Sequence, residues 1–165
     1  MAQSQLSPTL LDTTSITELK KPRIAIVYTE WNEKITAELV AGAERIAEQA
    51  GAAIVQKLAV PGSFELPFAC KQLWENRKDK KSAPEAIIAF GAVIRGGTPH
   101  FEYVCKAVTE GILQLNLMLP VPTIFGVLTL DNEQQATERL GGPHGHKGEE
   151  AAITALKMIR NSRKK

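Results

Sequence analysis

The apolar residues of this chain follow two alternating patterns. Four short apolar runs, rich in β-branched residues, are typical of strands and cover residues 23–28, 54–60, 86–93 and 121–128. Between them, apolar residues recur every three or four positions, which predicts helices over about 33–50, 65–76 and 100–119. The third run is apolar almost throughout, as expected for a strand that is buried on both faces of a sheet.

The pattern changes after the fourth strand. Asp131 and Gln134 have the spacing of a helix cap and predict a short helix that ends at Leu140. The glycine-rich residues 141–146 are predicted to be a loop, and a last helix is expected over 147–160. We therefore predict one domain over residues 21–160, flanked by a polar N-terminal tail at 1–20 and a basic C-terminal tail at 161–165.

Strands that alternate with helices favour a parallel sheet covered on both faces. The fold class we predict is α/β, a three-layer αβα sandwich with a four-stranded parallel sheet of the flavodoxin-like type. The N-terminal tail is interpreted as a segment that could add a strand to a neighbouring subunit. In such sheets ligands bind beyond the carboxyl ends of the strands. The expected site segments are 29–32, 61–65, 94–100 and 129–132.

Composition excludes several classes of function. The 165 residues carry a net charge of +2, which gives no support for a nucleic-acid or membrane partner. No apolar run approaches the roughly 18 residues of a membrane span, and no secretory signal is recognisable at the N-terminus. We therefore expect a cytoplasmic protein. Cys70 and Cys105 lie within helical patterns and are interpreted as reduced, buried thiols.

The loop from Arg95 to His100 (RGGTPH) follows a strand and opens a helix. Glycines allow a backbone to approach a ligand closely, and free N–H groups at a helix start favour an anion. Gly97 and Thr98 are thus candidates for phosphate binding; a plain turn capped by Thr98 is the alternative. His100 is a candidate for proton transfer near neutral pH, or else a capping or surface histidine.

Two further loops carry unusual residues. Trp31 is a large aromatic in the first loop, where it would pack on a flat ligand ring or on a neighbouring subunit. Phe64 and Glu65 follow Pro-Gly-Ser, and they could serve only to begin a helix. The first loop lacks the glycines of a dinucleotide loop or a P-loop, and His144 and His146 lack the companions of a metal site.

Taken together, the loops resemble one family. The motifs are Trp31-Asn32, the segment 61–67 (PGSFELP), the segment 91–104 (GAVIRGGTPHFEYV), the segment 122–128 (PTIFGVL) and Lys147-Gly148. The long third motif is highly specific, whereas the others would be weak alone. On these residues the chain resembles the lumazine synthases of riboflavin biosynthesis, from about Arg23 to Ile159.

The resemblance implies a transferase reaction. In this family 5-amino-6-(ribitylamino)uracil condenses with 3,4-dihydroxy-2-butanone 4-phosphate. An imine forms, phosphate is eliminated, and the ring closes with loss of water. No cofactor and no metal are implied, because the aminopyrimidine is itself the nucleophile, and positioning of the two substrates should supply much of the acceleration.

The resemblance also implies roles for individual residues. His100 would be the catalytic proton shuttle, and Gly97 and Thr98 would hold the phosphate. The residues implied to meet the pyrimidine ring or the ribityl chain are Trp31, Ser63, Phe64, Glu65, Ala92, Val93 and Ile94.

Three more residues match positions that the adjacent subunit supplies in the family. Phe125 and Lys147 would contact the pyrimidine and ribityl groups, and Arg139 would grip the phosphate. Arg95 lies within the long motif, but we assign it a structural ion pair. The implied partners are small-molecule substrates and further copies of the chain, as a pentamer or as twelve pentamers in an icosahedral capsid; the two assemblies stay open.

Three alternatives remain at this point. A riboflavin synthase of the related archaeal type would share the fold, but the 64–65 and 95–100 signatures favour lumazine synthase. A non-catalytic shell or flavin-binding paralogue could lose His100 or Arg139, and both are present. A flavodoxin-like binding module would want a glycine-rich first loop, which is missing.

Overall fold

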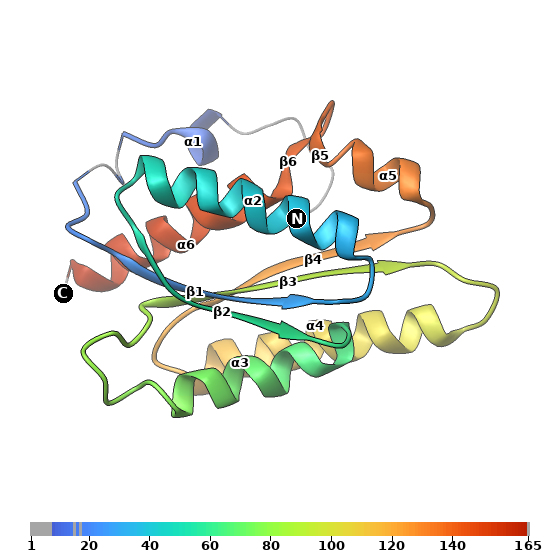
Figure 1. Cartoon of the computed structure of the whole chain (residues 1–165), viewed down its shortest axis with the longest axis horizontal. Coiled ribbons are helices and arrows are strands. Elements are labelled where there is room, and N and C mark those ends of the chain that lie inside the picture. Colours follow the sequence, from blue (N-terminus) through green and yellow to red (C-terminus); the bar gives the residue numbers. More distant parts are fainter. Residues whose placement is uncertain (1–7, 15, 17, 165) are drawn as a thin grey trace.

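The computed structural model describes residues 8–14, 16 and 18–164 of the chain. A central sheet is covered by helices on both faces (Figure 1). Its four strands are β1 (Arg23–Thr29), β2 (Ala53–Val60), β3 (Ala86–Ile94) and β4 (Thr123–Leu130). All neighbouring strands are parallel, in the order β2-β1-β3-β4. The predicted three-layer flavodoxin-like architecture is confirmed.

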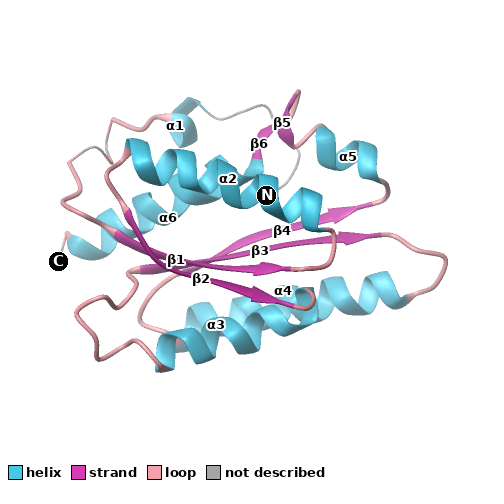
Figure 2. Ribbon diagram, in the orientation of Figure 1, coloured by secondary structure: helices cyan, strands magenta, loops and turns pink. Residues whose placement is uncertain are grey.

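The helices divide between the two faces of the sheet (Figure 2). The lower face in that view is covered by α3 (Leu66–Glu75) and α4 (His100–Met118), and the one-turn 3₁₀ helix η1 (Ser63–Glu65) precedes α3. The upper face carries α1 (Pro8–Leu11), α2 (Glu33–Gln49), α5 (Glu133–Thr137) and α6 (Lys147–Arg163). No described helix is both long enough and apolar enough to cross a membrane.

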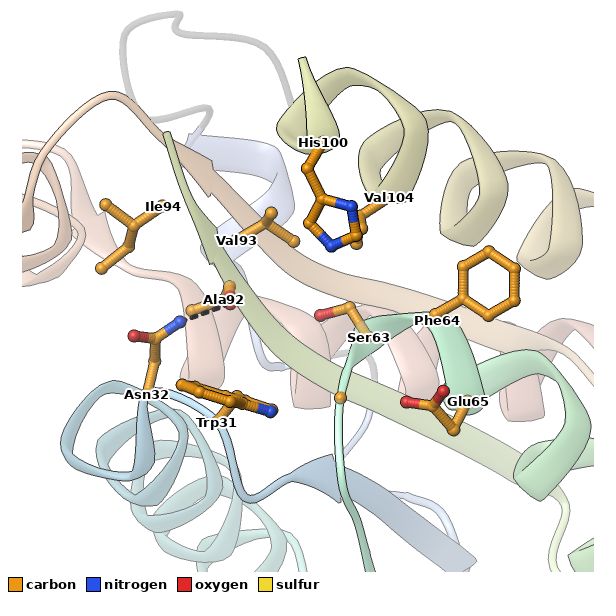
Figure 3. Close-up of a pocket in the computed structure, with 11 residues that line it drawn as sticks. Trp31, Asn32, Ser63, Phe64, Glu65, Ala92, Val93, Ile94, His100 and Val104 are labelled. Carbon is orange, nitrogen blue, oxygen red and sulfur yellow. Dashed lines mark hydrogen bonds between the residues drawn. The ribbon is translucent and has the colours of Figure 1, made fainter. Parts of the chain in front are cut away.

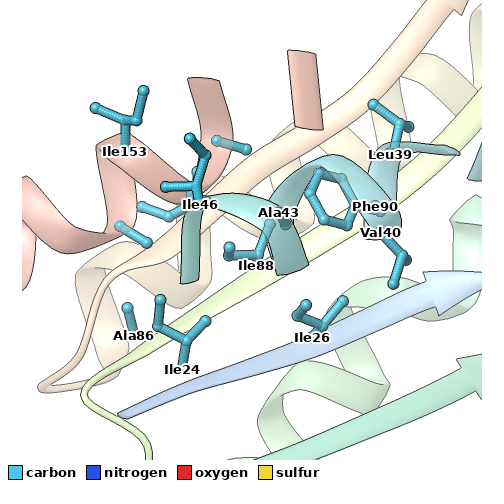
Figure 4. Packing of buried hydrophobic residues seen from close by; sticks show 14 of the residues in the cluster. Ile24, Ile26, Leu39, Val40, Ala43, Ile46, Ala86, Ile88, Phe90 and Ile153 are labelled. Atoms are coloured by element: carbon cyan, nitrogen blue, oxygen red, sulfur yellow. The ribbon is translucent and has the colours of Figure 1, made fainter. Parts of the chain in front are cut away.

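Each face of the sheet has its own core. Toward α2 and α6, Phe90 of β3 is fully buried among isoleucines such as Ile26 and Ile88 (Figure 4). Toward α3 and α4, the alternate residues Ile87 and Ala89 are equally buried. Because successive side chains of a strand point to opposite faces, a strand between two cores must be apolar at every position. This requirement explains the continuous apolar run in β3.

Helix α2 and the start of α6 approach so closely that two positions have no room for a side chain. A Cβ atom added at Gly148 would lie 2.1 Å from the Leu39 carbonyl oxygen, and one at Gly42 would lie 2.2 Å from Cε1 of His146. The His146 ring is itself fixed, because Nε2 lies 3.1 Å from Glu38 Oε1 and Nδ1 accepts from the Glu149 N–H at 3.4 Å. Glycine at both positions is therefore a condition of this packing.

The structure corrects the expectations for the region after β4. The loop predicted over 141–146 is instead a hairpin of β5 (Leu140–Gly142) and β6 (Gly145–His146), and α5 ends at Thr137 rather than at Leu140. The cap of α5 is Asn132, whose Oδ1 accepts from the Gln135 N–H at 3.1 Å, so the predicted pair was wrong by one residue.

The ends of the chain also differ from simple tails. Ile16 is only 1% exposed and belongs to the core beneath α2 and α6. Lys157 Nζ of α6 donates to the Thr9 carbonyl at 2.6 Å, so part of the segment before β1 packs on its own chain. Helix α6 continues past Arg160, its predicted end, to Arg163. The predicted strand exchange with a neighbour stays a prediction.

Candidate active site

A cavity of about 580 Å³ opens at the carboxyl ends of β1, β2 and β3. Three of the four segments that the parallel-sheet rule indicated line it. The fourth segment, after β4, is not among its lining residues. The lining residues, most of them labelled in Figure 3, are Trp31, Asn32, Gly62, Ser63, Phe64, Glu65, Ala92, Val93, Ile94, His100 and Val104.

The loop after β1 presents the indole ring of Trp31 to this cavity. The side chain is 73% exposed, and its flat face forms one wall (Figure 3). The backbone is held in place because the Trp31 N–H donates to the Pro61 carbonyl at 3.1 Å. Asn32 has a left-handed backbone with φ 59°, and its Nδ2 donates to the Ala92 carbonyl at 2.8 Å. A large apolar surface is thus kept open to solvent by a rigid loop.

The loop after β2 supplies one hydroxyl, one aromatic ring and one carboxylate. Ser63 is buried, and it packs so closely on Gly91 that a Cβ atom there would lie 2.6 Å from its Oγ. Phe64 is 62% exposed, and the Glu65 side chain extends toward the cavity from the end of η1 (Figure 3). The turn η1 thereby directs three chemically different groups to the same opening.

The end of β3 and the start of α4 complete the cavity. Ala92, Val93 and Ile94 form its inner edge, and the His100 ring points into it from the first residue of α4 (Figure 3). Gly97 and Thr98 are exposed in the loop between these two elements. The N-cap position of α4 is Pro99, and no side-chain hydrogen bond caps the helix, so the alternative that Thr98 caps it is wrong.

Arg95 is held by an ion-pair cluster beside the cavity. Its Nε donates to Asp131 Oδ1 at 2.8 Å, a second nitrogen pairs with Glu102, and its guanidinium carbon lies 4.1 Å from the centre of the Phe101 ring. The hydrogen bonds from Arg95 lower the pKa of both Asp131 and Glu102. The predicted ion pair of Arg95 is present, and its purely structural role stays a prediction.

The residues expected from an adjacent subunit gather elsewhere. Phe125, Arg139 and Lys147 line a second cavity of about 210 Å³ along β4, which has no lining residue in common with the first. Arg139 donates to the Gln135 carbonyl at 2.9 Å, and Lys147 Nζ lies 2.7 and 2.8 Å from the two oxygens of the buried Glu150. Within one chain, the predicted residues therefore line two separate cavities.

Sequence reasoning overlooked three lining residues of the first cavity. Asn32, Gly62 and Val104 were not assigned a role, although all three lie in the quoted motifs. The contribution of Asn32 depends on its contact with a residue sixty positions away, which no local pattern reveals. The sequence signal that could have indicated Asn32 is its position directly after the aromatic Trp31, at the end of a strand.

The first cavity combines a flat apolar wall with a few polar groups. The indole of Trp31 offers a stacking surface, and backbone groups at the end of β3 offer hydrogen bonds to a planar polar edge. Ser63 and Glu65 can bind hydroxyl groups, and His100 can transfer a proton. The open helix start beside them suits an anion. Such a site fits a planar heterocycle with a polar tail and a phosphorylated co-substrate.

Fold and cavity define a flavodoxin-like α/β protein with a ligand site at the carboxyl edge of its sheet. The family model for 6,7-dimethyl-8-ribityllumazine synthase matches residues 21–163. The chain belongs to the 6,7-dimethyl-8-ribityllumazine synthase family, and the resemblance found in its motifs is confirmed.

Relatives from distant bacteria support the assignment over nearly the whole chain. The 6,7-dimethyl-8-ribityllumazine synthase of Parabacteroides distasonis is 48% identical over 151 residues, covering 90% of this chain and 91% of the relative. That of Porphyromonas gingivalis is 50% identical, covering 84% of each chain. That of Kineococcus radiotolerans is 44% identical, covering 83% of each.

Proposed function

We propose that this protein is a 6,7-dimethyl-8-ribityllumazine synthase, a transferase of riboflavin biosynthesis. It condenses 5-amino-6-(ribitylamino)uracil with 3,4-dihydroxy-2-butanone 4-phosphate and releases phosphate and water. The observation that carries the proposal is that a single cavity gathers the aromatic wall, the polar loop after β2 and the histidine at the start of α4. Membership in the family supports the same reaction.

The first cavity binds the pyrimidine. Trp31 stacks on the ring, and the backbone of Ala92, Val93 and Ile94 meets its polar edge. Ser63, Phe64 and Glu65 meet the ribityl chain.

The loop before α4 binds the phosphate. A Cβ atom at Gly96 or Gly97 would meet no described atom within 4 Å, and neither glycine has a positive φ. Packing among the described residues therefore does not require glycine at either position, and the bare backbone leaves room for an outside ligand. The backbone N–H groups of Gly97 and Thr98 and the hydroxyl of Thr98 hold the phosphate, beside His100 as proton shuttle.

The catalytic unit contains two subunits. Phe125, Arg139 and Lys147 line a cavity of their own, so they complete the site of a neighbouring chain rather than their own. A heterologous contact of this kind generates a ring when the rotation between subunits closes. We propose a pentamer, which can be the final assembly or the building block of an icosahedral shell, with Arg139 reaching the phosphate across each interface.

The deciding experiment is a turnover assay with both substrates. Product fluorescence and released phosphate should rise together, in equal amounts, above the uncatalysed rate. Omitting either substrate should abolish both signals. If two molecules of lumazine are instead converted to riboflavin, the chain is a riboflavin synthase. A folded, oligomeric protein that gives neither product would contradict the proposal.

A further inference from the structure

The cluster around Arg95 encloses the loop that separates β3 from α4. Arg95 is the first residue after β3, and Glu102 lies in the first turn of α4. The ion pair between them therefore closes residues 96–101 into a small loop. Gly97, Thr98 and His100 lie within it. Glycines alone would leave such a segment conformationally free, so the loop needs an external restraint.

Arg95 provides this restraint through three side-chain contacts and one backbone hydrogen bond. The Arg95 guanidinium is planar, so contacts to Asp131, Glu102 and the Phe101 ring fix its orientation as well as its position. The Arg95 N–H also donates to the Leu130 carbonyl at 2.8 Å, extending the pairing of β3 with β4 by one residue. The start of the loop is thereby attached to β4, while its end is attached through Glu102.

These contacts leave Arg95 poorly suited to binding phosphate itself. Two carboxylates already face the guanidinium, and together they more than offset its single positive charge. To reach an anion, Arg95 would have to exchange these partners for the substrate. A guanidinium in this setting orders the backbone around a ligand more readily than it contacts the ligand.

We propose that Arg95 is a positioning residue, which holds the loop 96–100 in the conformation that binds the substrate phosphate and presents His100. The proposal rests on the proposed function. Because phosphate binding by backbone N–H groups requires their exact alignment, loosening the loop weakens binding of the phosphorylated substrate more than binding of the pyrimidine. Asp131 and Glu102 are parts of the same unit.

Steady-state kinetics of Arg95→Ala and of Glu102→Gln/Asp131→Asn test the proposal. Arg95→Ala should raise the KM for the phosphorylated substrate and the inhibition constant of inorganic phosphate about tenfold, with the KM for the pyrimidine unchanged. The double variant keeps Arg95 but removes both charges, and it should raise the same two constants about threefold. Arg95→Lys should fall between wild type and alanine, because an ammonium cannot bridge both carboxylates equally well.

Arg45 supplies a matched control. Its side chain is 45% exposed, against 44% for Arg95, and it also pairs with two carboxylates, Glu38 and Glu149. Arg45→Ala should leave both constants unchanged.

Each contrary outcome has a distinct meaning. If the double variant binds phosphate as well as or better than wild type while Arg95→Ala binds it weakly, Arg95 contacts the phosphate directly and the proposal is wrong. If Arg95→Ala changes neither constant, the cluster is only a surface ion pair. An inactive wild-type protein would instead contradict the proposed function. Titration with inorganic phosphate alone would still compare the phosphate affinities of the variants and so test the role of Arg95.

Discussion

The two cavities of this chain, which we propose to be the halves of an intersubunit site, are built in opposite ways. In the first cavity, the side chains of Trp31, Glu65 and His100 make no hydrogen bond to any described residue, and they face an open space. In the second, Arg139 and Lys147 are already attached to Gln135 and Glu150. In the proposed site the first cavity is the receiving half, which binds the ligand, and the second is the presenting half, whose charges are already held in position.

The difference shows where preorganisation is needed. If a cation reaches across an interface, as we propose for Arg139 and Lys147, the receiving chain gives it little support, so its own chain must hold it in place. Lys147 is held by a carboxylate that is 3% exposed, on the same helix three residues later. Aromatic and imidazole side chains need no such partner, because they have few rotatable bonds and therefore few conformations to restrict.

The largest effect on catalysis is expected from removal of the Arg139 guanidinium. Arg139→Ala should lower kcat/KM by roughly 10²-fold or more, because charge-assisted hydrogen bonds to the phosphate contribute about 1.5–3 kcal/mol each. Steady-state assays at varied concentrations of the phosphorylated substrate would measure it. An activity within twofold of wild type would remove Arg139 from the site.

A mixing experiment tests whether the halves belong to different subunits. The double variant Trp31→Ala/His100→Ala has a defective receiving half, the first cavity. The variant Arg139→Ala has a defective presenting half, the second cavity. When the two are unfolded and refolded together in equal amounts, about a quarter of the interfaces should combine two intact halves. Turnover should then recover to a similar fraction of wild type. No recovery in verified mixed oligomers would place the whole site within one chain.

His100→Ala should have a smaller effect than Arg139→Ala. We expect kcat to fall by about 10- to 10²-fold. A positioned acid–base group typically contributes about 10²- to 10⁴-fold, and the effect here should lie at or below the low end because the imine condensation proceeds slowly without help. The KM for the pyrimidine should stay constant. Unchanged turnover would show that another group, such as a phosphate oxygen of the substrate, moves the protons.

Trp31→Ala should act on binding alone. Loss of stacking is worth about 0.5–1.5 kcal/mol, so the KM for the pyrimidine should rise roughly two- to tenfold while Trp31→Phe stays near wild type. The exposed indole contributes little to the core, so the thermal midpoint should hardly move. Equal losses in the two variants would argue against stacking on a flat ring.

The smallest effect is expected at the far end of β3. Burial alone would raise the pKa of Glu85, but bonds from Arg163 and the Arg23 backbone leave this pKa below its usual value. The pairs therefore stabilise the fold above about pH 4.3, and the contribution is lost as pH falls further. Glu85→Gln should cost about 0.5–1 kcal/mol at pH 7 and flatten the acid limb in denaturant titrations, with turnover unchanged. A loss of turnover would mean that the two ends of the strand are coupled.

Much of the fold could be predicted from the sequence, because periodicity and burial agree in its long elements. β3 is apolar throughout and buried on both faces, and α4 has its apolar residues at helical spacing. The hairpin of β5 and β6 escaped prediction because its strands, of three and two residues, are too short to show alternation. Asn132 was missed because Asp131 has almost the same capping ability, and contact with Arg95 decides between them.

The candidate site was predictable to the extent that it depends on the ends of parallel strands. The segments around Trp31, Ser63 and His100 follow from that rule, and they meet in one cavity. The separation of Arg139 and Lys147 from this cavity could not be derived from spacing. It depends on where α5 and the hairpin place them in space, and on a family resemblance.

The contact between α2 and α6 has a consequence for engineering. Replacing a glycine within a helix by alanine is a common route to thermostability, worth roughly 0.5–1 kcal/mol when the site is open. Gly42 invites that substitution by its place in α2, yet the added methyl group would enter the His146 ring. At Gly148 it would meet main-chain oxygen, which cannot move aside. A stabilisation campaign should leave both glycines untouched and search the solvent-facing side of the same helices.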